Sequence, residues 1–312
     1  MDDNRSEIER WLRQRLDELS LSEKVRLLTG ADNWSIAASE VIGLRRIVLS
    51  DGPVGVRGER WDERETAANL PSPTALAASW DIAAATRLGE LLAAQARGKG
   101  VDVLLAPTVN LHRTPYGGRH FECFSEDPVL TAAIAGGYVT GVQRGGIAAT
   151  VKHFVANDAE TDRFTVDVHV DERALRELYL APFEAIVRRA GVWALMCSYN
   201  GVNGPTMSEH PLLSEVLKQE WGFDGLVMSD WKAVRSTVES ASAGLDLVMP
   251  GPDGPWGAAL VKAVEVDAVA ERVVDDKVLR LLRLAARVGA LADAPSAGDA
   301  PPAGDAPPAG DA

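Results

Sequence analysis

The stretch IAATVKH at residues 147–153 contains a short apolar run that ends in two polar residues. A helix-length amphipathic segment precedes it at 128–144, and another follows it at 172–190. An apolar run of roughly four to eight residues between such helices is typical of a buried parallel strand, because helices cover both faces of a parallel sheet. The stretch therefore predicts one strand–helix unit of an α/β fold.

The same unit recurs along the chain. Buried strands are expected at 46–49, 101–106, 147–151, 193–197, 226–228 and 245–249. Covering helices are expected at 82–99, 128–144, 172–190, 212–219 and 231–243. Six units in this order predict a (β/α)8 TIM-like barrel in which one or two units are missing or distorted.

A doubly wound parallel sheet is the alternative architecture. Such sheets usually carry a glycine-rich phosphate loop after a strand. The nearest candidates, 52–58 and 98–100, match neither GxGxxG nor GxxxxGK[ST], and both are interpreted as turns. The barrel is therefore the favoured architecture.

The two ends of the chain complete the predicted organisation. An N-terminal pair of helices is expected within 5–29, and a long closing helix within 266–291. From residue 292 the composition changes to repeats of Ala, Gly, Asp and Pro with a six-residue period. Such a sequence cannot form a packed core. We predict one catalytic barrel at 1–291 and a disordered linker or tail at 292–312.

The composition limits the classes of partner. The 312 residues include 32 Lys and Arg against 45 Asp and Glu, which gives a formal net charge of −13. An acidic surface repels nucleic acid and anionic lipid, so neither is expected as a partner. No window approaches the ~20 consecutive apolar residues of a membrane helix, and the start at 1–5 is polar rather than a signal peptide. We expect a soluble, cytoplasmic protein with a small neutral substrate.

Cysteine and histidine give no sign of a metal site. Cys123 and Cys197 are too few for a disulfide scaffold and lack the paired spacing of a zinc site, so two free thiols are expected. The five histidines are scattered along the chain, and none belongs to an HExxH motif. No metal and no cofactor are expected.

Polar residues follow the predicted strands. They occupy 50–53, 110–113 with 117–122, 152–153 with 157 and 163, 198–200 and 229–231. Reactive groups of a barrel lie at these strand ends, and carboxylates, cations and aromatic faces together suit a sugar ring with many hydroxyls. Carbonyl chemistry through a Schiff base on Lys152 is the alternative.

Five ordered motifs make a resemblance specific. They are SDGPVGVR at 50–57, GGRHFECFSEDP at 117–128, VKHF at 151–154, MCSYN at 196–200 and GLVMSDW at 225–231. Over about residues 15–290 the chain resembles glycoside hydrolase family 3 in its β-glucosidase branch. The resemblance implies retaining hydrolysis of terminal, non-reducing β-D-glucosides by two carboxyl groups roughly 5–5.5 Å apart.

The resemblance also assigns roles to residues. Asp230 matches the nucleophile that forms the covalent intermediate, and Tyr199 would steady its carboxylate. The subsite for the non-reducing sugar would comprise Asp51, Arg119, Lys152, His153, Arg163, Met196, Tyr199 and Trp231. Arg57 and Glu122 are expected to be structural partners within their loops.

The general acid/base is the point at which this chain departs from the branch. In that branch it is a Glu of a second α/β sandwich domain, so a further domain or chain is expected as a partner. The single-domain branch, which resembles bacterial N-acetylglucosaminidases, is disfavoured because KHFVAND at 152–158 lacks the Pro-Gly of that branch. Without the acid, only activated glycosides should react appreciably. A sugar-binding or inactive barrel subunit without turnover is the alternative function.

Overall fold

The computed structural model describes residues 2–60 and 62–295. The predicted tail at 292–312 lies outside the described residues from position 296 onward. Within the described part of the chain, no helix is long and apolar enough to cross a membrane.

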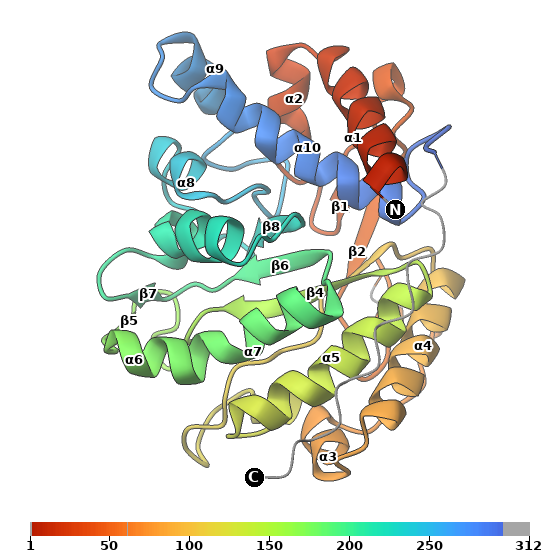
Figure 1. The fold of residues 1–312 in the computed structure, drawn as a ribbon, viewed down its shortest axis with the longest axis vertical. Helices are drawn as coiled ribbons and strands as arrows, with labels where there is room; N and C mark the ends of the chain where they lie inside the picture. The colour runs from red at the N-terminus through yellow and green to blue at the C-terminus, as the bar shows by residue number, and fades with distance from the viewer. Residues whose placement is uncertain (1, 61, 296–312) are drawn as a thin grey trace.

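A curled sheet of six strands forms the centre of the molecule (Figure 1). Its order is β1 (Ser35–Ile36), β2 (Ile47–Ser50), β3 (Val103–Leu104), β4 (Ala148–Phe154), β6 (Ala194–Cys197) and β8 (Leu226–Ser229). The strands from β2 to β8 are parallel to their neighbours, and β1 is antiparallel to β2. The carboxyl ends of the parallel strands therefore share one edge.

The sheet is a curled half-barrel, which corrects part of the prediction. A complete eight-stranded TIM barrel is not present in the described residues. The expected strand at 245–249 makes only isolated parallel bridges, from Leu247 to Met228 and from Val248 to Thr29. Prolines follow at 250, 252 and 255, and a residue without an N–H cannot extend a strand ladder.

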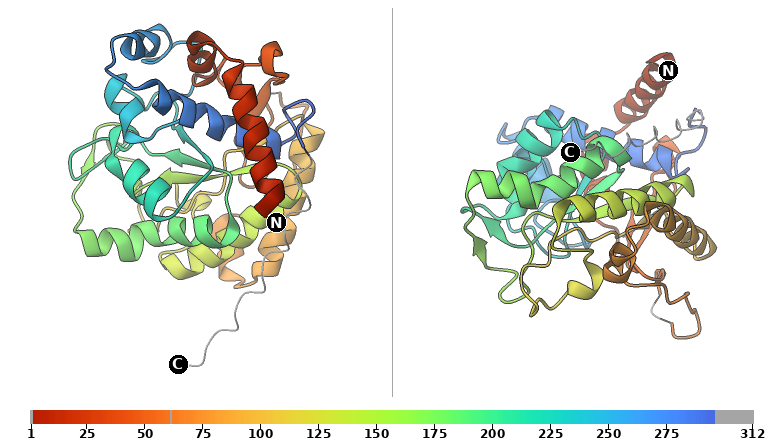
Figure 2. Two further views of the ribbon diagram at one scale, coloured as in Figure 1. Left: turned by 45° about the horizontal axis from the view of Figure 1, so that its top comes forward. Right: turned by 60° about the horizontal axis from the view of Figure 1, so that its bottom comes forward.

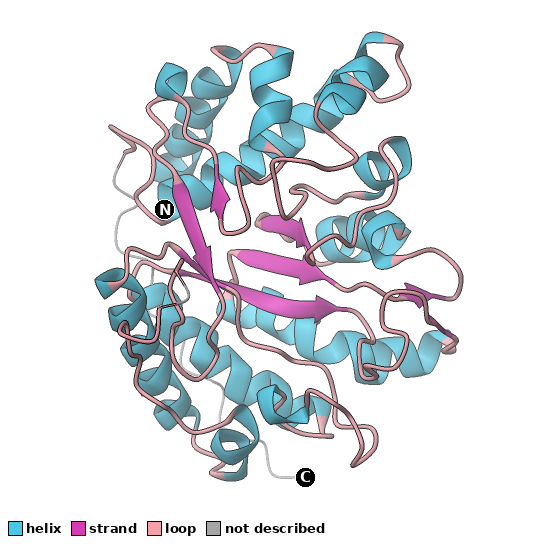
Figure 3. Ribbon diagram, turned by 180° about the vertical axis from the view of Figure 1, so that it is seen from behind, coloured by secondary structure: helices cyan, strands magenta, loops and turns pink. Residues whose placement is uncertain are grey.

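Helices cover the sheet on both sides (Figure 3). On one side lie α3 (Pro73–Ala78), α4 (Ile82–Gly98), α5 (Pro128–Arg144) and a continuous helical run of α6 (Glu172–Ala174), η3 (Leu175–Leu180), α7 (Ala181–Ala185) and η4 (Ile186–Ala190). On the other lie α1 (Asp2–Asp17), α2 (Leu21–Leu27), α9 (Ala258–Glu265) and α10 (Glu271–Arg287). In Figure 2, α1 (red) packs beside α10 (blue).

Shorter elements complete the chain. They are η1 (Glu40–Ile42), η2 (His120–Glu122), β5 (Asp167–Val168), β7 (Gly201–Val202), η5 (Met207–Glu209), η6 (Pro211–Leu213), η7 (Ser214–Glu220) and α8 (Val238–Ala243). Strands β5 and β7 pair as a separate parallel ribbon beyond the sheet edge.

Two predicted helices begin later than expected. The helix predicted at 231–243 is helical only from Val238, because Lys232 has a φ of +64° and the Trp231 indole turns to the Asn33 carbonyl. The helix predicted from 266 begins at Glu271, because Asp267 has a φ of +60° and ends α9. A left-handed residue stops a helix, since its backbone carbonyls no longer align with the axis.

Candidate active site

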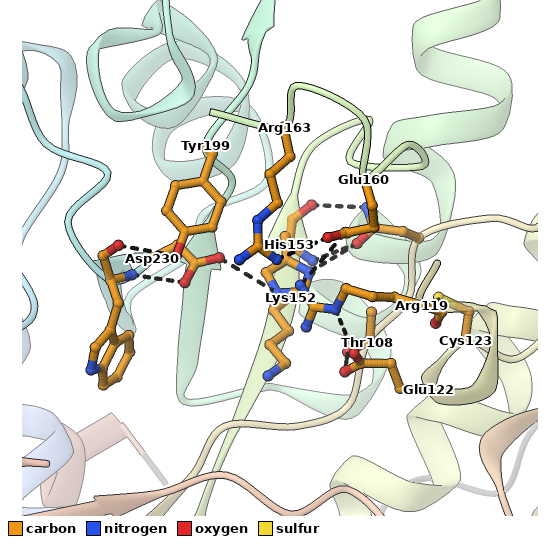
Figure 4. Close-up of polar contacts among 12 residues, drawn as sticks. Thr108, Arg119, Glu122, Cys123, Lys152, His153, Glu160, Arg163, Tyr199 and Asp230 are labelled. Atoms are coloured by element: carbon orange, nitrogen blue, oxygen red, sulfur yellow. Dashed lines mark hydrogen bonds and ion pairs between the residues drawn. The ribbon is translucent and has the colours of Figure 1, made fainter. Parts of the chain in front are cut away.

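Every residue that the sequence proposed for a sugar site lines one cavity of about 210 Å³. The cavity opens at the edge where the parallel strands end, so the loops after β2, β3, β4, β6 and β8 all contribute (Figure 4). Its lining consists of Asp51, Arg119, Lys152, His153, Arg163, Met196, Tyr199, Asp230 and Trp231, together with Trp34 and Leu105.

Trp34 and Leu105 were not foreseen. Trp34 directly precedes β1, whose antiparallel pairing with β2 carries the indole to the strand ends. Leu105 follows β3, and an apolar residue at a strand end carries no polar signal in the sequence. The sequence offers one signal for Trp34, because this large aromatic residue follows the polar Asp32 and Asn33 and lies outside any apolar run.

Asp230 is the buried carboxylate of the cavity, with 8% of its surface exposed. Its Oδ1 accepts a hydrogen bond of 2.7 Å from the backbone N–H of Trp231. Burial raises the pKa of Asp230, because it disfavours the charged form. The Lys152 ammonium, the Trp231 amide, the Tyr199 hydroxyl and the Arg119 guanidinium oppose that rise in pKa and favour the carboxylate.

His153 faces the same carboxylate as a neutral ring. Burial, reinforced by the positive charges of Arg119, Lys152 and Arg163, holds the pKa of His153 well below its usual value. Asn110 Oδ1 accepts from the His153 backbone N–H at 2.8 Å and lies 3.2 Å from Nδ1, so Nδ1 carries the ring proton. Nε2 is then an acceptor, and it lies 3.6 Å from Asp230 Oδ2.

Each cation of the cavity has a carboxylate partner. Lys152 Nζ lies 3.4 Å from Asp51 Oδ1, Arg119 Nε lies 2.5 Å from Glu122 Oε1, and Arg163 Nη1 lies 2.8 Å from Glu160 Oε2. Burial would raise the pKa of Glu122, but the hydrogen bond from Arg119 and the charge of Lys152 lower it overall. The expectation that Glu122 has a structural partner in its loop agrees with its contact to Arg119.

Aromatic rings form two groups at the cavity. The indoles of Trp34 and Trp231 lie with their centroids 5.3 Å apart, and Trp231 Nε1 donates to the Asn33 carbonyl at 2.9 Å. The Arg57 guanidinium stacks 3.7 Å from the Trp34 ring. On the other wall, Tyr199 and Phe164 have centroids 4.4 Å apart. The cavity therefore offers charged groups and apolar ring faces within a few ångströms of one another.

The two cysteines are free and buried, as predicted. Burial raises the pKa of Cys123 and of Cys197 to about 12, so neither is a thiolate near neutral pH. Neither cysteine lines the cavity.

Comparison with known proteins gives a consistent match. Residues 35–284 match the family described as the glycosyl hydrolase family 3 N-terminal domain. A β-glucosidase of Rhizobium radiobacter is 51% identical over 282 residues, which are 90% of this chain and 34% of that protein. β-Glucosidase B of Emericella nidulans is 46% identical over 276 residues, 88% of this chain and 32% of that protein. The chain spans about a third of the length of these curated relatives.

Solved structures agree with the sequence matches. β-Glucosidase 3B of Thermotoga neapolitana in complex with glucose superposes with a TM-score of 0.84 at 37% identity, over 89% of this chain and 42% of that one. The β-glucosidase of Kluyveromyces marxianus in complex with glucose superposes with a TM-score of 0.86 at 38% identity, over 90% of this chain and 35% of that one.

Proposed function

This chain belongs to glycoside hydrolase family 3, because residues 35–284 match the N-terminal domain of that family. We propose that it is the N-terminal domain of a retaining β-glucosidase. The proposed substrates are terminal, non-reducing β-D-glucosides. The names of its relatives, which are β-glucosidases, and the glucose bound by two structural neighbours support this substrate class.

The observation that carries the proposal is the position of Asp230. It is a buried carboxylate at the end of β8, and Lys152, Arg119 and Tyr199 favour its ionised form. In the proposed reaction an oxygen of Asp230 attacks the anomeric carbon, the glycosidic bond breaks, and the aglycone leaves with its electron pair. Water then attacks the anomeric carbon and displaces the Asp230 carboxylate, and the proton that the water loses neutralises the aglycone anion. Each of the two displacements inverts the anomeric carbon, so its configuration is retained overall.

The walls of the cavity suit one sugar ring. Lys152, Arg119 and Arg163 can donate to hydroxyls, whereas Asp51 and the Nε2 atom of His153 can accept from them. Trp34 and Trp231 offer flat faces for the C–H groups of the ring. The volume of about 210 Å³ is below the roughly 300–1,000 Å³ of pockets for drug-sized ligands, which favours a monosaccharide unit.

A proton donor for the aglycone is proposed to come from outside this chain. The other carboxylates around the cavity, Asp51, Glu122 and Glu160, each lie in an ion pair with a cation. The hydrogen bond from Arg119 and the charge of Lys152 lower the pKa of Glu122 despite its burial. The relatives are about three times as long, so a second domain or chain is a natural source of this group. General acid catalysis contributes about 10²- to 10⁴-fold, so the chain alone should act mainly on activated glycosides.

Covalent labelling tests the proposal. The chain is incubated with 2,4-dinitrophenyl 2-deoxy-2-fluoro-β-D-glucoside, whose leaving group departs without a proton, and is then analysed by intact mass and peptide mapping. We expect one fluoroglucosyl adduct on Asp230, and no adduct in Asp230→Asn, because an amide is a poor nucleophile.

The matched control is Asp158→Asn, which replaces a partly buried carboxylate that accepts a 2.9 Å hydrogen bond from Leu111 N and does not line the cavity. Labelling of this variant should equal that of the wild type. An adduct that persists in Asp230→Asn would refute the role of Asp230.

The second candidate is a sugar-binding barrel without turnover. It is favoured by the pairing with cations of the other carboxylates near the cavity, Asp51, Glu122 and Glu160, since each of them is held in an ion pair. Glucose that raises the melting temperature of a chain that takes no label would support this candidate over the hydrolase.

A further inference from the structure

We propose that Glu160 is a positioning residue that holds Arg119 and Arg163 in the wall of the sugar cavity. Glu160 does not itself line the cavity. The inference rests on the proposed function only for the identity of the ligand, because the arrangement of the three charged side chains is a property of the fold.

Glu160 joins two loops that reach the cavity separately (Figure 4). Arg119 follows β3, whereas Glu160 and Arg163 follow β4. Oε2 of Glu160 lies 2.8 Å from Nη1 of Arg163, and its Oε1 lies 3.9 Å from Nη1 of Arg119. One carboxylate thus faces guanidinium groups from both loops.

The need for such a carboxylate follows from the charges. Lys152, Arg119 and Arg163 all line a small cavity, and like charges repel strongly where little water screens them. Arg119 has a second carboxylate behind it, because its Nε donates to Glu122. Arg163 lies about 5 Å above the rings of Phe164 and Tyr199, and Glu160 supplies its hydrogen-bonded carboxylate. Removal of Glu160 therefore affects Arg163 most.

The stem of Glu160 is also held. A Cβ placed on Gly118 would lie 3.3 Å from Cγ and 3.4 Å from Cβ of Glu160, so the backbone that carries Arg119 packs directly against this side chain. Because Gly118 has no side chain, the side chain of Glu160 can lie directly against its backbone, between the two loops. This contact is independent of the ion pairs, and it orients the carboxylate toward both guanidinium groups.

The consequence concerns binding more than the chemical step. Guanidinium groups bind hydroxyls well only from defined positions, because their N–H donors lie in a fixed planar fork. Glu160 makes no contact with Asp230 that would alter its attack. Loss of Glu160 should therefore weaken sugar binding and leave the limiting rate of bond formation almost unchanged.

Labelling kinetics with the same fluoroglucoside test this inference on the full chain. In Glu160→Gln we expect the half-saturating concentration to rise about tenfold, while the limiting rate changes less than about threefold. Glu160→Asp keeps the charge and should restore part of the affinity. The matched control is Glu177→Gln. It removes an exposed carboxylate that lies 3.0 Å from Arg173 Nε and does not line the cavity, so this variant should behave as the wild type.

Crystal structures of the wild type and of Glu160→Gln separate this inference from the proposed function. We expect the Arg163 guanidinium to leave the cavity wall in the variant. An Arg163 that stays in place, or a half-saturating concentration equal to that of the wild type, overturns the inference. If the wild type takes no label, the proposed function fails, and the position of Arg163 alone then decides the role of Glu160. A residue that served stability alone would lower the melting temperature without moving Arg163.

Discussion

Asp230 owes its chemical character to its neighbours. Burial alone would favour the neutral acid, and the nearby ammonium, guanidinium and hydroxyl groups favour the carboxylate that a nucleophile requires. His153 remains neutral beside it, because burial, reinforced by the charges of Arg119, Lys152 and Arg163, lowers its pKa. The cavity therefore holds a carboxylate and an imidazole acceptor side by side without an imidazolium.

Tyr199→Phe tests this balance at the level of one hydroxyl. The phenolic proton of Tyr199 can reach the Asp230 carboxylate or the Trp231 carbonyl, the latter at 3.0 Å. A hydrogen bond to the carboxylate lowers the pKa of Asp230, so its removal raises that pKa further. The acid limb of the labelling rate should move to higher pH, and the rate near pH 5 should fall about tenfold. The measurement is dinitrophenolate release across a pH series.

Tyr179→Phe is the control for this change. Tyr179 faces Arg113, whose guanidinium lies 5.5 Å from its ring, and it does not line the cavity. Its pH profile should match that of the wild type. An unaltered profile in Tyr199→Phe would mean that the hydroxyl does not act on Asp230.

Helices α4 and α5 illustrate how packing is set at the level of elements. They approach so closely that a Cβ on Gly141 would lie 2.0 Å from the Thr86 carbonyl oxygen, and one on Gly89 would lie 2.4 Å from the Tyr138 carbonyl oxygen. These clashes involve backbone atoms, which cannot rotate away. The two glycines therefore set the distance between the helices that flank β3 and β4, the strands that lead into the loops of Arg119 and Arg163.

A pair of substitutions in α5 should act in opposite directions. Gly141→Ala should lower the free energy of unfolding by about 2 kcal/mol or more, because the helices must separate. Gly136→Ala, in the same helix but with nothing within 4 Å of the added Cβ, should raise it by about 0.5–1 kcal/mol, because alanine loses less backbone entropy. Urea denaturation measures both, and equal effects would contradict the packing argument.

The packing of the C-terminal helix α10 against the rest of the molecule buries charged side chains. α10 crosses from α1 to the end of the sheet, and Lys277 on this helix donates at 2.6 Å to the carbonyl of Leu245. Burial, with a further contribution from the charge of Lys218, lowers the pKa of Lys277 to about 7. The charged groups that act on Lys277 are Lys218, Asp246, Asp276 and Arg280.

The stability of the molecule should therefore depend on the protonation of Lys277. Between about pH 7 and pH 10 the unfolded lysine binds a proton that the folded one lacks, so the free energy of unfolding rises with pH by up to about 1.4 kcal/mol per unit. Below about pH 7 Lys277 is charged in the folded and in the unfolded protein, so the folded state bears the full free-energy cost of burying its charge. Lys277→Met removes this cost, so its advantage over the wild type should be largest near pH 6 and shrink toward pH 9.

Chemical denaturation at several pH values measures this difference. Lys262→Met, which removes an exposed lysine of α9, is the control, and its effect should not vary with pH in this window. A constant difference between Lys277→Met and the wild type would show that Lys277 is charged at all these pH values.

Local patterns determined much of this protein. The helix at 128–144 was predicted with the bounds that the structure shows, and strands β2, β4, β6 and β8 fall on predicted apolar runs, because periodicity and caps act within a few residues. The residues proposed for the sugar site came from the resemblance of the motifs near the strand ends to those of glycoside hydrolase family 3. The carboxyl ends of parallel strands lie at one edge of the sheet, so residues that follow different strands become neighbours in the cavity.

Features that depend on contacts between distant segments could not be predicted from local sequence patterns. The antiparallel β1 brings Trp34 to the cavity, and the isolated bridges of 245–249 leave the sheet a half-barrel. Glu160 is an ordinary loop residue in the sequence, and its place between two arginines exists only where the loops after β3 and β4 meet. Local sequence patterns thus predict which side chains lie at the edge of the sheet. Their burial, protonation and charge partners were decided by long-range packing, because the environment of a charge is made by every element around it.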